Sequence, residues 1–259
     1  MNICLHLSDY SNMTISYLKD LKVDWVRTDW IQTPNGSMES YCQELQRNNI
    51  NLLTIFDTNT FGSQNFSLTE WNNTIEKIVK SPSFQSVDAV EVWNEPNGFA
   101  YLTPETYYGM LKSAYVIIKN YSSVPVIFAG ISPNIVGWQS YICQVFHKDI
   151  EKYFDFMGIH LYDDVATNLN TLQFLKSLTD KPIWLTETGK PTENDDQAAQ
   201  ATYLNSTYSS YKSLVAKIFI YELNDNYGLT PEKENHFGLI QLNGTKKESY
   251  DVVWKINRK

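Results

Sequence analysis

The stretch Val90–Asn97 reads VEVWNEPN and joins an apolar run to a polar Asn-Glu pair followed by proline. A short run of branched and aromatic residues is typical of a strand buried on both faces of a parallel sheet. Pro96 has no backbone N–H and cannot continue a sheet ladder, so the strand is expected to end before it. The sequence therefore predicts Glu95 at the carboxyl end of a buried strand.

Similar runs recur along the chain, each followed by a segment with helical features. Ser67 and Glu70 have the spacing of a capping box, and Thr103 precedes Pro104 as a cap precedes a first helical residue. A (β/α)8 barrel needs roughly 250 residues, so eight alternations predict one such α/β barrel spanning residues 1–259. The predicted strands are Ile3–His6, Val23–Arg27, Asn51–Phe56, Val87–Trp93, Val124–Ala129, Phe154–His160, Ile183–Thr186 and Ala216–Tyr221.

A second strand also ends in a glutamate, in the stretch PIWLTETG at residues 182–189. Glu95 and Glu187 then follow the fourth and seventh strands, and the carboxyl ends of all barrel strands open on one face. Two carboxylates facing one cleft match the needs of glycoside hydrolysis. In a retaining enzyme they are about 5–5.5 Å apart, one as proton donor and the other as nucleophile.

The Trp-Asn-Glu-Pro of residues 93–96, together with Glu187, resembles the signature of glycoside hydrolase clan A. Families 39 and 5 of that clan are the nearest, and the segment from His236 to Tyr250 resembles family 39. The resemblance implies a retaining mechanism on a (β/α)8 barrel. It implies Glu95 as the acid/base, Glu187 as the nucleophile and Asn94 as a ligand of the sugar 2-hydroxyl.

Two further segments match the clan. Arg27 matches an arginine that supports the nucleophile, although a structural ion pair with Glu91 inside the barrel is the alternative. The stretch IHLY at residues 159–162 matches a His-x-Tyr motif, in which Tyr162 would hydrogen-bond Glu187. His160 is either part of this site or a buried core histidine.

The chain also departs from the clan pattern. Tyr221 stands where clan members commonly carry a tryptophan beneath the sugar, so it is the candidate platform. Phe56-Asp57 stands where family 5 often has a histidine. Trp30 and Glu222 are candidate substrate contacts by their position at strand ends, with a solvated rim as the alternative.

Composition limits the partners. The net charge is −8 and no cluster of Lys and Arg is present, which argues against nucleic acid and anionic membranes. No apolar run approaches the ~18 residues of a membrane-spanning helix. Aromatic residues make up 14% of the chain, which suits stacking on sugar rings. Three dispersed cysteines and four dispersed histidines predict no metal site and no cofactor.

The expected function is hydrolysis of a β-linked oligo- or polysaccharide by a monomer. Endo action is expected because the chain has no large insertions that could close one end of a groove. The alternatives are an exo-acting β-xylosidase-like enzyme and a carbohydrate-binding barrel without turnover. The start MNICLHLSDY lacks the features of a signal peptide. Sequons nevertheless favour an extracellular or cell-surface protein. They lie at Asn12, Asn35, Asn65, Asn72, Asn120, Asn205 and Asn243.

Overall fold

A computed structural model of the chain describes residues 1–5, 12–31, 37–62, 66–98, 100–146, 149–192 and 196–259. The end of the first predicted strand at His6 lies outside these residues, as do the sequons at Asn35 and Asn65. None of the described helices is long and apolar enough to cross a membrane. The cysteines Cys4, Cys42 and Cys143 are all free thiols.

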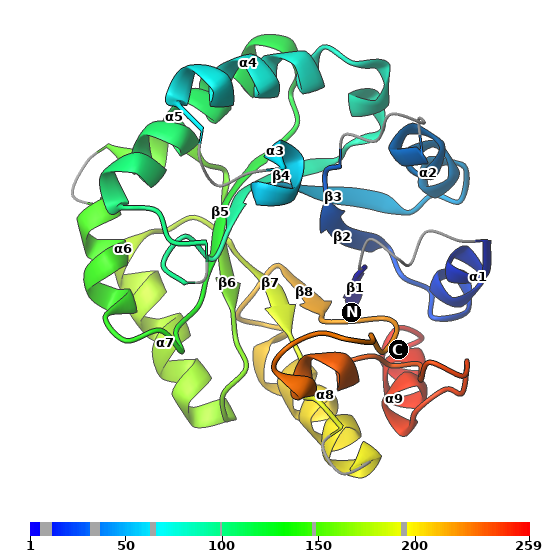
Figure 1. Ribbon diagram of the computed structural model, residues 1–259. Helices are drawn as coiled ribbons and strands as arrows, with labels where there is room; N and C mark the ends of the chain where they lie inside the picture. The colour runs from blue at the N-terminus through cyan, green and yellow to red at the C-terminus, as the bar shows by residue number, and fades with distance from the viewer. Residues whose placement is uncertain (6–11, 32–36, 63–65, 99, 147–148, 193–195) are drawn as a thin grey trace.

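Eight parallel strands form a closed barrel in the order β1 to β8, which confirms the predicted (β/α)8 fold (Figure 1). The first and last strands close it, with Asn2 paired with Phe219 and Ile3 with Ile220. The strands are β1 (Asn2–Cys4), β2 (Trp25–Asp29), β3 (Asn51–Phe56), β4 (Ala89–Asn94), β5 (Val126–Ile131), β6 (Phe156–His160), β7 (Ile183–Thr188) and β8 (Lys217–Ile220).

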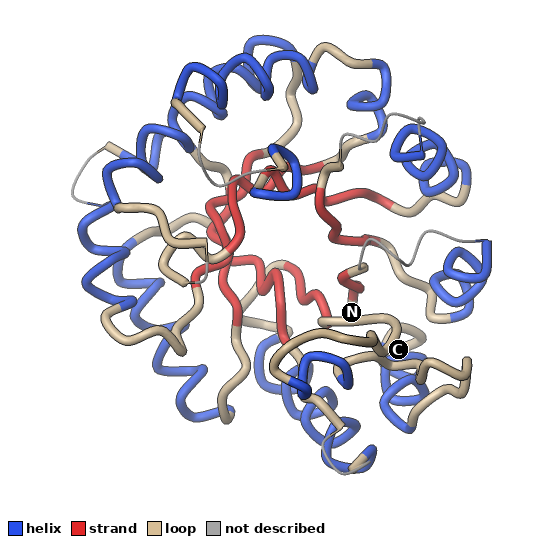
Figure 2. The backbone as a smooth tube through the Cα atoms, in the orientation of Figure 1, coloured by secondary structure: helices blue, strands red, loops and turns tan. Residues whose placement is uncertain are grey.

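Helices surround the barrel, and Figure 2 shows them as an outer ring around the strands. The main helices are α1 (Asn12–Asp20), α2 (Ser37–Arg47), α4 (Leu68–Val79), α5 (Pro104–Tyr121), α6 (Trp138–Phe146), α7 (Val165–Leu178), α8 (Gln197–Tyr211) and α9 (Glu248–Ile256). The short helical turns are α3 (Thr58–Phe61), η2 (Pro82–Ser86), η3 (Ile150–Tyr153) and η5 (Glu232–His236).

Local sequence explains where the helices begin. Ser67 and Glu70 form the predicted capping box, in which each side chain accepts from the backbone N–H of the other. Thr103 caps α5 through the N–H of Thr106, with Pro104 as the first helical residue. Such caps satisfy N–H groups that have no partner within the helix.

Strand starts differ from the prediction by about two residues at several positions. Val23 and Val87 are buried but precede β2 and β4, because they pack in the large hydrophobic core without joining the hydrogen-bond ladder. Apolar runs report burial and not backbone pairing, which accounts for the difference. At the other end, β2 and β7 continue past their apolar residues to Asp29 and Thr188.

The barrel interior holds a small apolar cluster, called here the lower barrel cluster. It lies toward the amino ends of the strands and is separate from the large core between strands and helices. The Lys217 ammonium covers it from below, 4.4 Å from the ring centroid of Trp25. The members are Cys4, Leu53, Ala89, Ile127, Trp184 and Phe219.

Candidate active site

Glu95 leaves the end of β4 through an unusual backbone conformation. Trp93 and Glu95 have φ angles of 74° and 44°, in the left-handed region that non-glycine residues rarely occupy. The Trp93 indole donates to the Ala100 carbonyl at 2.9 Å, and the Glu95 N–H donates to the Gly130 carbonyl at 3.1 Å. These bonds hold the turn, and the Glu95 side chain remains one quarter exposed.

Arg27 connects the two strands that carry the glutamates. From β2 its Nε donates to Glu91 and its Nη1 to Glu187, both at 2.6 Å, and its Nη2 donates to Asn94 at 2.9 Å. Arg27 is 3% exposed and Glu91 is fully buried. Buried charges are stable only when they are paired and hydrogen-bonded, so the two carboxylates and Arg27 depend on one another. Arg27 therefore makes both of the contacts that were considered for it: an ion pair with Glu91 inside the barrel, and a hydrogen bond to Glu187.

Glu91 is fixed from the other side by β5 and β7. Its Oε1 accepts from the Gly130 N–H at 2.7 Å and from the Thr186 hydroxyl at 3.0 Å. We call Arg27, Glu91, Asn94, His160 and Glu187 the Arg27 network. Its members come from β2, β4, β6 and β7, so four strands must close correctly to assemble it.

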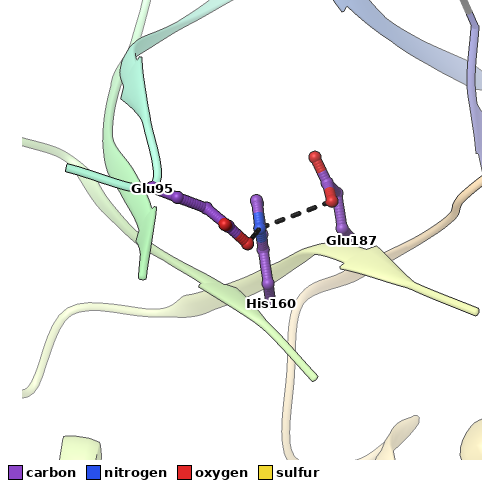
Figure 3. A group of neighbouring side chains, drawn as sticks. All are labelled: Glu95, His160 and Glu187. Carbon is purple, nitrogen blue, oxygen red and sulfur yellow. Dashed lines mark hydrogen bonds and ion pairs between the residues drawn. The ribbon is translucent and has the colours of Figure 1, made fainter. Parts of the chain in front are cut away.

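His160 lies between the two glutamates, as Figure 3 shows. Its Nδ1 is 2.7 Å from Glu95 Oε1 and 3.4 Å from Glu187 Oε2. The ring fits because residue 130 is glycine, since a Cβ there would meet His160 Nε2 at 2.0 Å. Burial lowers the pKa of His160, but the charges of Glu187 and Glu95 outweigh it, and the pKa is raised. A protonated Nδ1 is thus favoured as the donor to Glu95.

Glu187 is held in its ionised form. Burial raises its pKa, but the positive charges of His160 and Arg27 and the hydrogen bond from Tyr162 together lower it below the ordinary value. The Tyr162 hydroxyl donates to Glu187 Oε2 at 2.7 Å. One oxygen of Glu95, one of Glu187 and a ring nitrogen of His160 all lie within 4.8 Å of one another.

Carboxylates and imidazole are also metal ligands, so this trio is the group of described residues with the donors for a cation. Its surroundings fit a cation poorly. The Arg27 guanidinium and the Tyr162 hydroxyl already occupy both oxygens of Glu187. A buried positive charge in direct contact with Glu187 repels a second one.

A cavity of about 1280 Å³ opens above the two glutamates. It extends over the loops that follow β5 to β8 and reaches the start of α8. Glu95 and Glu187 lie in its wall with Asn94, Tyr162 and Tyr221, whereas Arg27 and His160 are buried behind the wall. The two carboxylates are therefore accessible from the cavity, whereas Arg27 and His160, which lower the pKa of Glu187, are not.

A family model described as glycosyl hydrolase catalytic core matches residues 5–234. The chain belongs to this glycosyl hydrolase family. The match confirms the glycoside hydrolase family that the sequence resembles. Among curated proteins, no sequence matches this glycosyl hydrolase.

Solved structures share the fold of this glycosyl hydrolase at low identity. A family 39 glycoside hydrolase from Bacteroides cellulosilyticus WH2 has a TM-score of 0.77 at 18% identity, over 99% of this chain and 63% of that chain. A monomeric β-xylosidase from Caulobacter crescentus CB15 has a TM-score of 0.75 at 15% identity, over 99% and 67%. A Ruminococcus gnavus β-glucuronidase has a TM-score of 0.73 at 14% identity, over 99% of this chain and 49% of that chain. The chain thus spans half to two thirds of these proteins.

The remaining predicted residues occupy different places in this glycosyl hydrolase. Tyr221 lines the cavity and stands edge-on to Phe237, with ring centroids 5.4 Å apart. Trp30 does not line the cavity, because its ring is buried in the core against Phe56 and Phe84. Glu222 is fully buried, and its Oε1 accepts from Asn226.

Two further polar residues that follow strands β3 and β4, Asp57 and Asn97, have structural partners. Asp57 caps α3 through the N–H of Asn59, and its pKa is raised to about 7 by burial and by the charge of Asp29. Asn97 exchanges two hydrogen bonds with the backbone of Ser132. These side chains shape the mouth of the barrel rather than its cavity wall.

Sequence reasoning missed Glu234 and Lys233, which reach the cavity from η5. They belong to the irregular segment after β8, where no strand or helix period indicates direction. Only the structure shows that they line the same cavity as Glu95 and Glu187.

Proposed function

We propose that residues 1–259 form a single catalytic domain, a retaining glycosidase that cleaves β-linked glycans through a covalent glycosyl–enzyme intermediate. The observation that carries the proposal is the approach of Glu95 and Glu187, whose nearest oxygens lie within 4.8 Å of each other. Retaining enzymes have carboxyl groups about 5–5.5 Å apart, whereas inverting enzymes need roughly 6.5–9.5 Å to admit a water. The short separation supports retention.

The two glutamates have different surroundings, which supports different roles. Glu187 is buried, contacts Arg27 and Tyr162, and has a lowered pKa, as a nucleophile requires. Glu95 is partly exposed at the cavity wall and contacts His160. A group that gives a proton to the substrate and later takes one from water needs this access.

In the first step Glu95 donates its proton to the glycosidic oxygen as the bond from that oxygen to the anomeric carbon breaks. A Glu187 oxygen forms the new bond to that carbon, and the alcohol leaves. In the second step Glu95, now ionised, takes a proton from water while the water oxygen attacks the same carbon. The bond to Glu187 breaks, and both side chains return to their starting forms.

Neighbouring side chains assist these steps. The Asn94 oxygen accepts from Arg27, so its amide NH₂ is the part presented to a sugar hydroxyl. Tyr162 and Arg27 hold Glu187 in place for attack. Tyr221 offers its ring to the sugar bound there. These roles agree with those implied by the clan resemblance.

The size of the cavity supports endo action on a polysaccharide. Its volume of about 1280 Å³ exceeds the roughly 300–1,000 Å³ of ordinary ligand pockets, so it has room for several sugars. The alternative is exo-acting β-xylosidase-like hydrolysis, favoured by the segment from His236 to Tyr250 and by the fold shared with a β-xylosidase. Metal and cofactor are not required by this mechanism, and we expect a monomer.

The test is a panel of β-glucans, xylans and mannans, with product sizing and proton NMR of the first anomer released. Retention predicts the β-anomer first, and endo action predicts a ladder of oligosaccharides. Release of the α-anomer would contradict the mechanism, and monosaccharide alone would favour the exo alternative. Binding of a glycan without turnover, equal in wild type and Glu95→Gln, would identify a non-catalytic barrel. Hydrolysis rates are also measured with and without a chelator. We expect them to be equal, because no metal takes part in the proposed mechanism.

A further inference from the structure

A third carboxylate faces the catalytic pair. Glu234 lies on η5, the short helix drawn in orange beside α8 in Figure 1, and lines the same cavity as Glu95 and Glu187. Its pKa is raised by burial and by the negative charges of Glu187 and Glu95, against the opposing charge of Lys233. The mechanism above gives this side chain no role.

The segment that carries this third carboxylate is fixed. Asn235 accepts from the Leu229 N–H at 2.9 Å and donates to the Leu229 carbonyl at 3.1 Å. The His236 carbonyl accepts from the buried Lys247 ammonium at 3.2 Å. Lys247 in turn pairs with Asp225 at 2.7 Å. A carboxylate on a support held in this way keeps its position without a ligand, which is how binding groups are preorganised.

The cavity wall is also rich in negative charge. Among the described lining residues, carboxylates outnumber lysines by six to two. Asp164 and Asp196 cap α7 and α8, but their charges remain. The carboxylates are Glu95, Asp163, Asp164, Glu187, Asp196 and Glu234, and the lysines are Lys190 and Lys233.

We propose that Glu234 determines specificity by accepting hydrogen bonds from hydroxyls of the sugar held against Glu95 and Glu187, and that the cavity selects neutral sugars over uronic acids. A carboxylate accepts from two neighbouring hydroxyls at once, and these charge-assisted bonds are strong. A uronate would bring a like charge into the same space, which is costly. This inference rests on the proposed glycosidase function.

The test compares aryl β-glucoside, β-xyloside and β-galactoside with aryl β-glucuronide and β-galacturonide. We expect kcat/KM for the preferred neutral substrate to fall roughly 10- to 100-fold in Glu234→Gln, the effect of weakening a hydrogen bond to a charged group. The preference for neutral over uronic substrate should fall at least about tenfold.

The matched control is Glu232→Gln, which removes the same charge two residues away from a side chain that is 82% exposed. Its kcat/KM should stay within about twofold of wild type, as for most surface changes. A preference that is the same in the two variants would overturn the proposal. So would a uronide as the best substrate of the wild type.

A binding measurement separates this inference from the proposed function. Calorimetry with Glu187→Gln, with and without Glu234→Gln, uses neutral β-oligosaccharides and oligoglucuronides. Neutral-selective binding that depends on Glu234, without turnover in wild type, would support this inference and contradict the hydrolysis. Turnover in wild type, with a selectivity that is unchanged in Glu234→Gln, would support the hydrolysis and contradict this inference. Binding of neither class would overturn the inference.

Discussion

The lower barrel cluster and the Arg27 network occupy one barrel but differ in chemistry. Ala89 and Glu91 are two residues apart on β4, and Trp184 and Thr186 are two apart on β7. In each case the first side chain joins the apolar cluster and the second bonds within or beside the network. Two residues along a strand therefore separate the apolar lower barrel cluster from the charged Arg27 network.

The two regions tolerate change differently for physical reasons. Apolar burial contributes in proportion to area, about 25 cal/mol per Å², whatever the direction of contact. A buried charge depends on particular partners, and removing one leaves another unpaired. The lower barrel cluster should thus govern stability alone, and the Arg27 network should govern stability and activity together.

The largest effect on activity is expected at Glu187. Glu187→Gln keeps a polar side chain for Arg27 and Tyr162 to contact but removes the proposed nucleophile. We expect kcat to fall roughly 10⁴-fold or more, as in other enzymes that lose a covalent nucleophile. Steady-state rates on an aryl β-glycoside measure it, with circular dichroism to verify folding. Full activity in a folded variant would reject the assignment.

Arg27→Met should break the network at its centre. It leaves Glu91 buried without its cation, so the free energy of unfolding should fall by about 3–5 kcal/mol. We expect kcat/KM to fall roughly 10²- to 10³-fold, the usual loss when a charge-stabilising donor is removed. Urea unfolding and kinetics measure both. Arg27→Lys keeps the charge and should lie between; stability equal to wild type in Arg27→Met would show that the network contributes nothing.

Tyr162→Phe should have a smaller effect and a shift in pH dependence. Tyr162 lowers the pKa of Glu187, so its loss raises that pKa. Activity needs ionised Glu187 and is lost as the pH falls through this pKa. The acid limb of kcat/KM should therefore move to higher pH, and the rate should fall roughly 10- to 100-fold. Tyr108→Phe, which loses a surface bond to Asp149, is the control. An unmoved acid limb would count against this contact.

The smallest effect on activity is expected in the lower barrel cluster. Phe219→Ala should reduce the free energy of unfolding by about 3–5 kcal/mol because it leaves a cavity. At a temperature where the protein stays folded, kcat should remain within about twofold of wild type, since no contact to the catalytic pair is lost. Denaturant melts and rates on the same sample separate the two. A tenfold loss of kcat in the folded variant would contradict the claim that the lower barrel cluster affects stability alone.

The fold was accessible from sequence because buried parallel strands give short apolar runs that alternate with helical periods. The capping pairs at Ser67 and Thr103 also follow from local chemistry. Strand starts were less accessible, since Val23 and Val87 are buried outside the ladder.

The site was accessible where a polar residue lies at or near the carboxyl end of a strand and points inward. Arg27, Glu95, His160 and Glu187 meet this condition, and the structure brings them together. Trp30 lies three residues after Arg27 along β2 and its end, and an odd step points to the opposite face, so the ring enters the outer core. Alternation could have indicated this. Glu234 could not be found, because a loop has no period from which to infer direction.

The meeting of the chain ends has a practical consequence. Asn257 donates to the Met1 and Leu21 carbonyls at 2.9 Å, so the two chain ends lie near each other beside the start of β1 (Figure 1). The cavity is lined by residues at and beyond the carboxyl ends of the strands, at the other end of the barrel. A linker, tag or solid support attached at either end would leave the cavity facing outward. Immobilised protein should therefore keep access to large insoluble glycans, and a joined-end permutant opened elsewhere would need only a short bridge.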